Sequence, residues 1–283
     1  MIFTINSDNL IATIDSCGAQ LLSVVANGKQ RLWQNDDGSW NGHAPVLFPA
    51  CGRTKTLVDG KPYDLPMHGF AKRCEFVGRQ IDACKVQFTL VSDDFTRAVY
   101  PFDWKFVITY GVRDNMLTIN CDVTNIGDNQ MYFSLGGHES FALDGDISDY
   151  TLYFPSDEKI VTLLHNEKGL LTGETQTLAS GHFLPLPRSF MTEGRTVIIA
   201  DVKSEFVQLL DKQNNVVAES RFNGFTNLLL WHPNADSKMV CIEPWLNLPD
   251  NAAAPATELS QKRGFVCLGS GASKRFAREI RYF

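Results

Sequence analysis

The 283-residue sequence has no apolar run long enough to cross a membrane and no block of basic residues. A membrane-spanning helix needs about 20 largely apolar residues in a row, and no stretch approaches that length. Lysine and arginine (26) are outnumbered by aspartate and glutamate (32), which gives a net charge of −6. An acidic chain without a basic patch is a poor partner for nucleic acid or an anionic membrane. We therefore expect neither as a partner.

Several signatures of known chemistry are also missing. The sequence has no Gly-X-Ser-X-Gly nucleophile turn, no phosphate-binding loop and no dinucleotide fingerprint. Its seven cysteines are odd in number and include no Cys-X-X-Cys pair, and most lie in apolar runs. Such cysteines behave as small buried hydrophobic residues in a reducing compartment. With no charged segment and long apolar run at the start of the sequence, a cytoplasmic protein is the simplest expectation.

Helical signals are scarce, whereas short β-type runs recur along the whole chain. Short helices are expected only at residues 93–100 and 257–263, and residues 35–44 and 163–187 are expected to be irregular. Turns follow many of the β-type runs, and Asn27-Gly28 and Asp59-Gly60 are strong hairpin signals. Spacings of about 8–12 residues between strands favour a sandwich or barrel over alternating strands and helices. The sequence thus predicts one all-β domain covering residues 1–283. The expected strands are residues 2–5, 10–14, 21–26, 31–33, 75–78, 85–91, 104–110, 117–123, 131–135, 151–154, 196–201, 206–210, 216–220, 227–231, 239–242, 264–268 and a partly exposed 272–283.

A carboxylate stands at the end of one strand that looks fully buried. Residues 239–242 are apolar and rich in β-branched side chains, and Glu243-Pro244-Trp245 follows them. Proline cannot donate to a sheet ladder and keeps the residue before it extended. Trp245 offers a flat apolar surface of the kind that packs on a sugar ring. Glu243 is therefore a candidate catalytic group, and Trp245 is a candidate substrate contact.

Two further segments each place a histidine beside glycine. His68-Gly69-Phe70 follows a proline-containing turn, and Gly136-Gly137-His138 follows an apolar strand. Paired glycines at a strand end allow a bulge or the close approach of another group. Together with Glu243-Pro244, these motifs resemble those of the aldose 1-epimerase (galactose mutarotase-like) family. They occur in the family's order, 70 and 105 residues apart, and the resemblance covers nearly the whole chain, most closely the compact proteins of bacterial sugar operons.

The resemblance implies a galactose mutarotase-like supersandwich of antiparallel sheets and an isomerase that interconverts the anomers of a hexose. Opening and closing a pyranose ring needs an acid and a base, and no redox cofactor. Carried over by motif, Glu243 is the base, His138 the acid and His68 a stabilising group at the ring oxygen. Arg53, in the early segment 48–53, matches an arginine that contacts sugar hydroxyls. We expect a small-molecule sugar as the partner, no cofactor, and a monomer or homodimer.

The remaining candidates are weaker. His232 ends a strand just before the Glu243 strand and is a possible substrate contact. His43 is expected to be a satisfied loop residue, and His165 and His182 are expected on the surface. Glu139 should point away from His138, because neighbouring side chains on a strand alternate between faces. The family's further sugar-binding aspartate has no clear match, with Asp201 and Asp211 both open.

Three alternatives compete with a neutral-hexose epimerase. A zinc site could use His68, His138, Glu243, Cys51 and Cys241, but our interpretation of the spacing finds no close ligand pair, so no metal is expected. A non-catalytic sugar-binding sandwich would need no acid–base pair. A hexose 6-phosphate epimerase would place cations around the phosphate, and the sequence has Arg53, Lys55, Lys72 and Arg73 near the first two motifs. The net charge of −6 and a lysine at Lys72, where the phosphate-specific branch is expected to have arginine, favour the neutral sugar.

Overall fold

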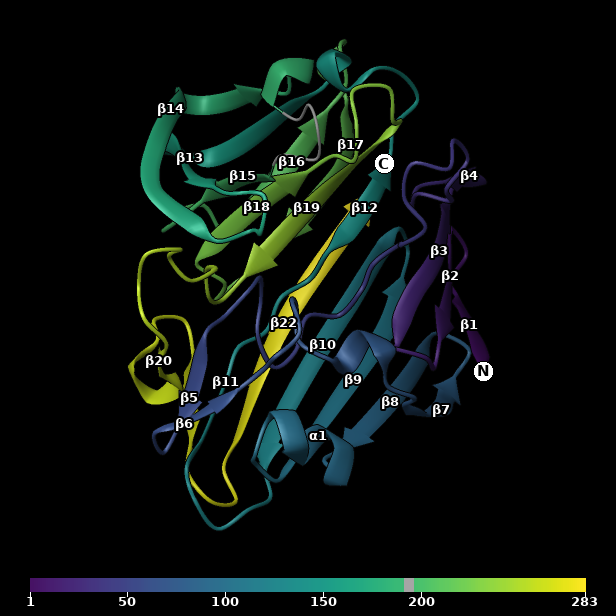
Figure 1. The fold of residues 1–283 in the computed structure, drawn as a ribbon. Coiled ribbons are helices and arrows are strands. Elements are labelled where there is room, and N and C mark those ends of the chain that lie inside the picture. Colours follow the sequence, from purple (N-terminus) through teal and green to yellow (C-terminus); the bar gives the residue numbers. More distant parts are fainter. Residues whose placement is uncertain (191–195) are drawn as a thin grey trace.

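The computed structural model describes residues 1–190 and 196–283 and consists mainly of β-strands (Figure 1). One α-helix, α1 (Asp94–Val99), and the short 3₁₀ turns η1 (Ala71–Arg73), η2 (Ile147–Asp149), η3 (Arg188–Phe190) and η5 (Leu259–Gln261) lie between strands. No helix in this part of the chain is long and apolar enough to span a bilayer. The strands are β1 (Ile2–Asn6), β2 (Leu10–Asp15), β3 (Gln20–Ala26), β4 (Lys29–Gln30), β5 (Thr56–Val58), β6 (Lys61–Tyr63), β7 (Val77–Asp82), β8 (Lys85–Val91), β9 (Trp104–Arg113), β10 (Met116–Asn125), β11 (Met131–Phe133), β12 (Glu139–Ala142), β13 (Thr151–His165), β14 (Leu171–Pro185), β15 (Thr196–Ile199), β16 (Phe206–Leu210), β17 (Val216–Arg221), β18 (Asn227–Trp231), β19 (Met239–Trp245), β20 (Thr257–Glu258), β21 (Val266–Leu268) and β22 (Ser273–Tyr282).

A 13-stranded sheet runs through the molecule. Its order is β12-β19-β18-β15-β13-β16-β17-β22-β10-β9-β8-β7, and β14 pairs with β13 beside this path. The ladders of this sheet are antiparallel, which confirms the predicted antiparallel all-β architecture. Smaller sheets are formed by β1-β2-β3-β4, β11-β21 and β20-β5-β6.

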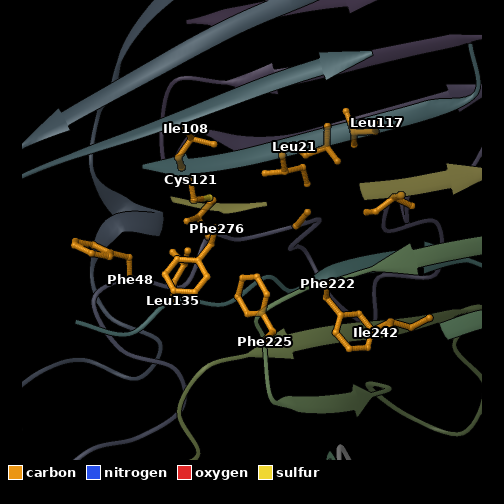
Figure 2. Close-up of a cluster of buried hydrophobic side chains, with 14 of the residues drawn as sticks. Leu21, Phe48, Ile108, Leu117, Cys121, Leu135, Phe222, Phe225, Ile242 and Phe276 are labelled. Carbon is orange, nitrogen blue, oxygen red and sulfur yellow. The ribbon is translucent and has the colours of Figure 1, made fainter. Parts of the chain in front are cut away.

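The hydrophobic core joins the four-stranded sheet to the large sheet. Leu21 of β3, Ile108 of β9 and Ile242 of β19 are all buried members of one cluster. Figure 2 shows this cluster, with aromatic side chains such as Phe276 and Phe225 between the strands, their ring centroids 5.6 Å apart. Because β19, the strand that carries Glu243, contributes to this core, the position of that carboxylate is fixed by packing.

Several local predictions are confirmed. Asn27, Gly28, Asp59 and Gly60 all have positive φ, which is the conformation that tight two-residue hairpins require. Helix α1 begins after Asp93, whose side chain accepts a hydrogen bond from Thr96 N in a capping box. The two turn sequences and the cap therefore dictate these features locally.

Other expectations are wrong. Residues 163–187 are mostly not irregular, because β13 and β14 form a long hairpin there. Strand β14 is largely exposed on both faces, so it lacks the apolar alternation that identifies a strand. Residues 257–263 contain β20 and η5 instead of an α-helix, and residues 31–33 lie beyond the two-residue β4. The expectation for residues 272–283 is confirmed: β22 is a partly exposed strand, and its alternate residues Phe276, Arg278, Ile280 and Tyr282 are buried.

Candidate active site

Alternate residues of three adjacent strands line a cavity of about 400 Å³. In Figure 1, β12, β19, β18 and β15 lie side by side in the upper half of the molecule. Successive side chains on a strand point to opposite faces, and the cavity is lined by one set from each strand. The residues of this set are Thr196 and Ile198 on β15, Leu229 and Trp231 on β18, and Glu243 and Trp245 on β19. The volume is within the usual range for small-molecule sites.

The register between β12 and β19 places His138 opposite Glu243. Glu139 pairs with Ile242, and Gly136 forms a bridge with Trp245 on the far side of His138. Gly137 N also donates to Pro244 O at 3.1 Å. Directly opposite residues in an antiparallel pair present their side chains on the same face. The His138 Nε2 atom accordingly lies 3.4 Å from Glu243 Oε1, although 105 residues separate the two in sequence.

The two glycines before His138 make this close arrangement possible. A Cβ atom at Gly136 would lie 2.7 Å from Cys51 Sγ and 2.9 Å from Trp245 Cδ1. A Cβ atom at Gly137 would lie 1.7 Å from Arg278 Nη1. The guanidinium of Arg278 fills that space and forms a buried ion pair with Glu139. Glu139 thus points away from the cavity, as predicted, and side chains larger than hydrogen at 136 and 137 are excluded by contact.

Glu243 is almost completely removed from solvent. Its side chain is 2 % exposed, and among the described residues no group forms a hydrogen bond of normal geometry with Oε2. Burial raises the pKa of this carboxyl well above its ordinary value, and the nearby Glu139 carboxylate adds to the effect, while the Trp245 indole opposes it. The protonated carboxyl is therefore strongly favoured compared with a glutamate in water.

His138 is held in its neutral form by the same burial. Desolvation lowers its pKa to about 3, and the Lys72 ammonium contributes in the same direction. One face of the ring stacks on Trp40, with centroids 5.3 Å apart and planes 24° apart. Its Nδ1 atom is buried and has no hydrogen-bond partner in the part of the chain that the structure describes. His138 and Glu243 thus form a buried pair in which the neutral state of each is favoured, so the pair holds one proton.

His68 reaches the same cavity from a tight turn. Its backbone has φ +65°, a conformation that few side chains adopt and that is often found at functional sites. His68 N donates to Gly52 O at 2.9 Å, and Gly52 N donates to His68 Nδ1 at 3.2 Å. Since Nδ1 accepts a hydrogen bond, the neutral ring carries its proton on Nε2. Burial, with smaller contributions from His138, Lys72 and Arg53, lowers the pKa of His68 well below its usual value.

Arg53 and Trp245 also line the cavity. Arg53 is exposed and donates through Nε to Lys168 O at 2.8 Å, which links it to the turn between β13 and β14. Trp245 is buried, its ring centroid is 5.2 Å from that of His68, and its indole N–H faces the Glu243 carboxyl, whose pKa it lowers. The structure therefore brings together five of the six residues predicted for the site: His68, His138, Glu243, Arg53 and Trp245.

Comparison with known proteins agrees with this geometry. A family model described as "Aldose 1-epimerase" matches residues 1–262. The chain belongs to the aldose 1-epimerase family. The chromosomal LacX protein of Lactococcus lactis is 26% identical to this family member over 265 residues, 88% of each chain. A galactose mutarotase-like protein from Lactobacillus casei has a TM-score of 0.93 and 27% identity, with all of both chains covered. A galactose mutarotase-related enzyme from Lactobacillus acidophilus has a TM-score of 0.91 and 26% identity, covering 100% of this chain and 97% of that one. The galactose mutarotase-like fold is thereby confirmed.

His232, the sixth residue predicted for the site of this family member, does not line the cavity. It is fully buried, its Nδ1 atom faces Met239 O, and it is not among the residues that line the cavity. Leu229 and Trp231 of β18 line the cavity, whereas Leu228 and Leu230 belong to the main core. Leu228, Leu230 and His232 are alternate residues, so their side chains point to the same face of the sheet. His232 therefore lies on the core side of β18 and not on the cavity side.

The structure also settles the position of the weaker candidates. Asp201 pairs with Arg263, and Asp211 bonds its own turn at Asn215, so neither lines the cavity. His43 is satisfied by Trp33 O at 2.8 Å, and His182 is exposed, both as expected.

His165 is partly buried and lines the cavity, contrary to the expected surface position. Its Nε2 accepts from Thr196 N at 3.1 Å, and its Nδ1 lies 3.0 Å from Asn166 O. Both ring nitrogens are therefore engaged in holding the wall of the cavity.

Three aromatic or cationic cavity residues were not found from the sequence. Trp40 lies in the irregular segment 35–44, where no periodicity predicts its contact with His138. Trp231 ends an apolar run, so its face could not be assigned in advance. Lys168 lies in the turn between β13 and β14 and lines the cavity beside Arg53. The only available signal for Lys168 was its place in a long segment between strands.

From the sequence we expected no metal, because we found no two potential metal ligands close together in the chain, but one such pair exists. Cys241 and Glu243 are two residues apart on β19 and share a face, and ligand atoms of Cys241, Glu243 and His138 all lie within 4.8 Å of one another. Burial raises the pKa of the Cys241 thiol well above its ordinary value. Cysteine binds a metal as the thiolate. The protonated Cys241 thiol is therefore a poor ligand. The three donors are close enough for a transition metal, but the buried environment opposes the charge that binding requires.

Proposed function

We propose that this member of the aldose 1-epimerase family interconverts the α and β anomers of a hexose by acid–base catalysis. The observation that carries the proposal is the buried pair of Glu243 and His138, with Oε1 and Nε2 3.4 Å apart in the cavity. This separation is longer than a good hydrogen bond, so a sugar oxygen can compete for either group. Enzyme sites are where burial shifts the pKa values of paired groups in this way.

Ring opening requires two proton transfers. Glu243, as carboxylate, takes the proton from the hydroxyl on C1. The C1–O5 bond then breaks as C1 becomes a carbonyl, and imidazolium His138 gives a proton to O5. Rotation about C1–C2 presents the other carbonyl face, and the same steps in reverse close the ring. The proton inventory is balanced, because each group ends a half-reaction in the state that the other half-reaction needs.

The buried pair of Glu243 and His138 can supply both the carboxylate and the imidazolium without taking up a proton from solvent. With Glu243 protonated and His138 neutral, movement of one proton from Oε1 to Nε2 creates the carboxylate and the imidazolium together. The empty cavity disfavours this charge separation because both groups are buried. A bound sugar replaces the missing solvent with hydroxyl groups and a ring oxygen, which stabilise the charged pair.

The other cavity residues suit binding and orientation. The Nε2–H of His68 is available to donate to the ring oxygen, since Nδ1 is occupied by Gly52 N. Trp245 offers an apolar face together with an indole N–H directed at the Glu243 carboxyl, and Arg53 presents guanidinium donors at the entrance. Cytoplasmic location remains part of this proposal.

Polarimetry of freshly dissolved α-glucose and α-galactose tests the proposal. The wild-type protein should accelerate the change in optical rotation in proportion to its concentration, and heat-denatured protein should not. A protein that binds these sugars in calorimetry but leaves every anomerisation rate at its uncatalysed value would be a sugar-binding module, and the enzyme assignment would be wrong.

A further inference from the structure

The cavity has more positive than negative side chains, although the chain as a whole has a net charge of −6. Arg53, Lys72 and Lys168 line it, opposed by the carboxylate of Glu167 and by the buried Glu243. Of the four cations that the sequence offered near the first motifs, only Arg53 and Lys72 line the cavity. Lys55 is turned away, because its ammonium donates to three backbone carbonyls of the 251–254 loop.

These three cations have no ionic partner among residues 1–190 and 196–283. Arg53 uses Nε for Lys168 O, which leaves its terminal nitrogens unpaired. Within residues 1–190 and 196–283, Lys72 donates only to the backbone oxygen of Met67, at 3.1 Å, and the Lys168 ammonium has no hydrogen-bond acceptor. Some other cations of the chain do pair, as Lys262 does with Asp250 and Arg275 with Asp122. Unpaired cations gathered at a binding cavity attract anionic ligands.

The cations also lie on the histidine side of the cavity. Arg53 directly follows Gly52, which is hydrogen-bonded to His68, and Lys72 is bonded to the residue before His68. In the proposed mechanism the ring oxygen faces His68 and His138. The exocyclic C6 group is attached to C5, next to that oxygen. A substituent on C6 would therefore project toward Arg53 and Lys72.

The backbone holds this part of the cavity together. Asp250 N donates to Arg53 O at 3.0 Å, and Leu171 N donates to Asp250 O at 2.9 Å. With the Arg53–Lys168 bond, these contacts tie three segments of the chain into one rim. The cationic groups are thus attached to a braced frame before any ligand binds, which reduces the entropy lost on binding.

We propose that the preferred hexose has an anionic group on C6, a phosphate or a carboxylate, with Arg53, Lys72 and Lys168 as its counter-ions. This inference rests on the proposed function, because the orientation of C6 follows from placing C1 and O5 at the acid–base pair. Arginine binds phosphate or carboxylate oxygens in pairs, and lysine adds a point charge. The net charge of −6, which favoured a neutral sugar, does not describe the field inside this cavity.

The experiment compares glucose and galactose with glucose 6-phosphate and glucuronate in an exchange NMR assay of anomerisation. We expect kcat/KM for an anionic sugar to exceed that for both neutral sugars by about tenfold or more, as charged hydrogen bonds are stronger than neutral ones. Lys168→Gln and Arg53→Gln should remove most of this preference. The matched control is Lys105→Gln, since Lys105 is an exposed lysine on β9 that does not line the cavity. The two anionic sugars separate a phosphate site from a carboxylate site.

The outcomes for the inference and for the proposed function can be distinguished. Equal or better turnover of neutral sugars, with both variants affecting all sugars alike, would overturn the anionic preference and leave the epimerase assignment standing. If no sugar is anomerised, the proposed function fails, and calorimetric titration with the same four sugars decides the inference. Tighter binding of an anionic sugar, lost in Lys168→Gln, supports the cation site. Equal binding of all four sugars, or no binding, overturns it.

Discussion

Replacing Glu243 by glutamine should abolish most of the catalysis and also stabilise the protein. The amide has nearly the same volume, but it cannot accept the proton of the C1 hydroxyl. General acid–base groups contribute roughly 10²–10⁴-fold to rates. We expect a loss in the upper part of this range, because the other carboxylate that lines the cavity, Glu167, is exposed on a turn outside the sheet.

The stability gain follows from the raised pKa of Glu243. A carboxyl with a higher pKa in the folded than in the unfolded state binds a proton on folding, so it destabilises the fold increasingly as pH rises above the unfolded value. Each unit of upward shift is worth about 1.4 kcal/mol at high pH, or about 3–6 °C in Tm at the 2–4 °C per kcal/mol typical of domains of 150–250 residues. The glutamine variant does not titrate. Its advantage should therefore be larger at pH 7–8, shrink as the pH falls toward the ordinary glutamate value of 4.5, and be absent below it.

Two assays on the same samples check both effects. Polarimetry measures the rate, and thermal unfolding followed by circular dichroism between pH 4 and pH 8 measures the stability difference. Glu205→Gln is the matched control, because Glu205 is exposed and distant from the cavity lining. The difference that remains at low pH reports the packing of amide against carboxyl. A glutamine variant that is no more stable at pH 8 than at pH 4, relative to wild type, would show that the pKa of Glu243 is not raised by burial.

Further predictions concern the rest of the site. His138→Ala should also reduce the polarimetric rate by about 10²–10⁴-fold while sugar binding, measured by calorimetry, is retained. For wild type, kcat/KM should be flat with pH above the His138 pKa of about 3, until Glu243 loses the shared proton at a pH well above the ordinary glutamate value; a steep change that is already complete near the ordinary value of 4.5 would contradict the one-proton pair. Arg53→Ala should raise KM more than it lowers kcat, and the opposite split in steady-state kinetics would place Arg53 in the chemical step. Gly137→Ala should lower the free energy of unfolding in urea by about 3 kcal/mol or more, because the new Cβ displaces the buried Arg278 guanidinium from its ion pair.

The sequence predicts those parts of the fold that depend on local chemistry. The turns at Asn27-Gly28 and Asp59-Gly60 use residue types that few other conformations favour, and α1 lies within the expected residues 93–100. Strands with one apolar face, or with a continuous apolar run, were also predicted, because this pattern is visible in the local sequence. Strand β14 was missed because both of its faces are largely exposed, and β20 because pairing with β5, which is distant in sequence, stabilises it.

The candidate site was predictable where a motif carried it. His68, His138 and Glu243 each lie beside glycine or proline at the end of a run, and the register of β12 and β19 brings two of them together. The face of β18 was not predictable, since residues 228–231 are all apolar and give no alternation. His232 was misassigned for that reason. Trp40 was missed because its position depends on tertiary contacts alone.

Saturation transfer in proton NMR tests the central claim most directly, because it measures anomer exchange at equilibrium in one sample. The H1 signal of one anomer is irradiated and the H1 signal of the other is observed, with the four sugars named above. With wild-type protein the second signal should decrease for at least one sugar, and with Glu243→Gln at the same concentration it should not. Two results would contradict an acid–base pair built on Glu243 and His138. In the first, the signal decreases equally with wild type and with Glu243→Gln; in the second, wild type causes no decrease for any sugar.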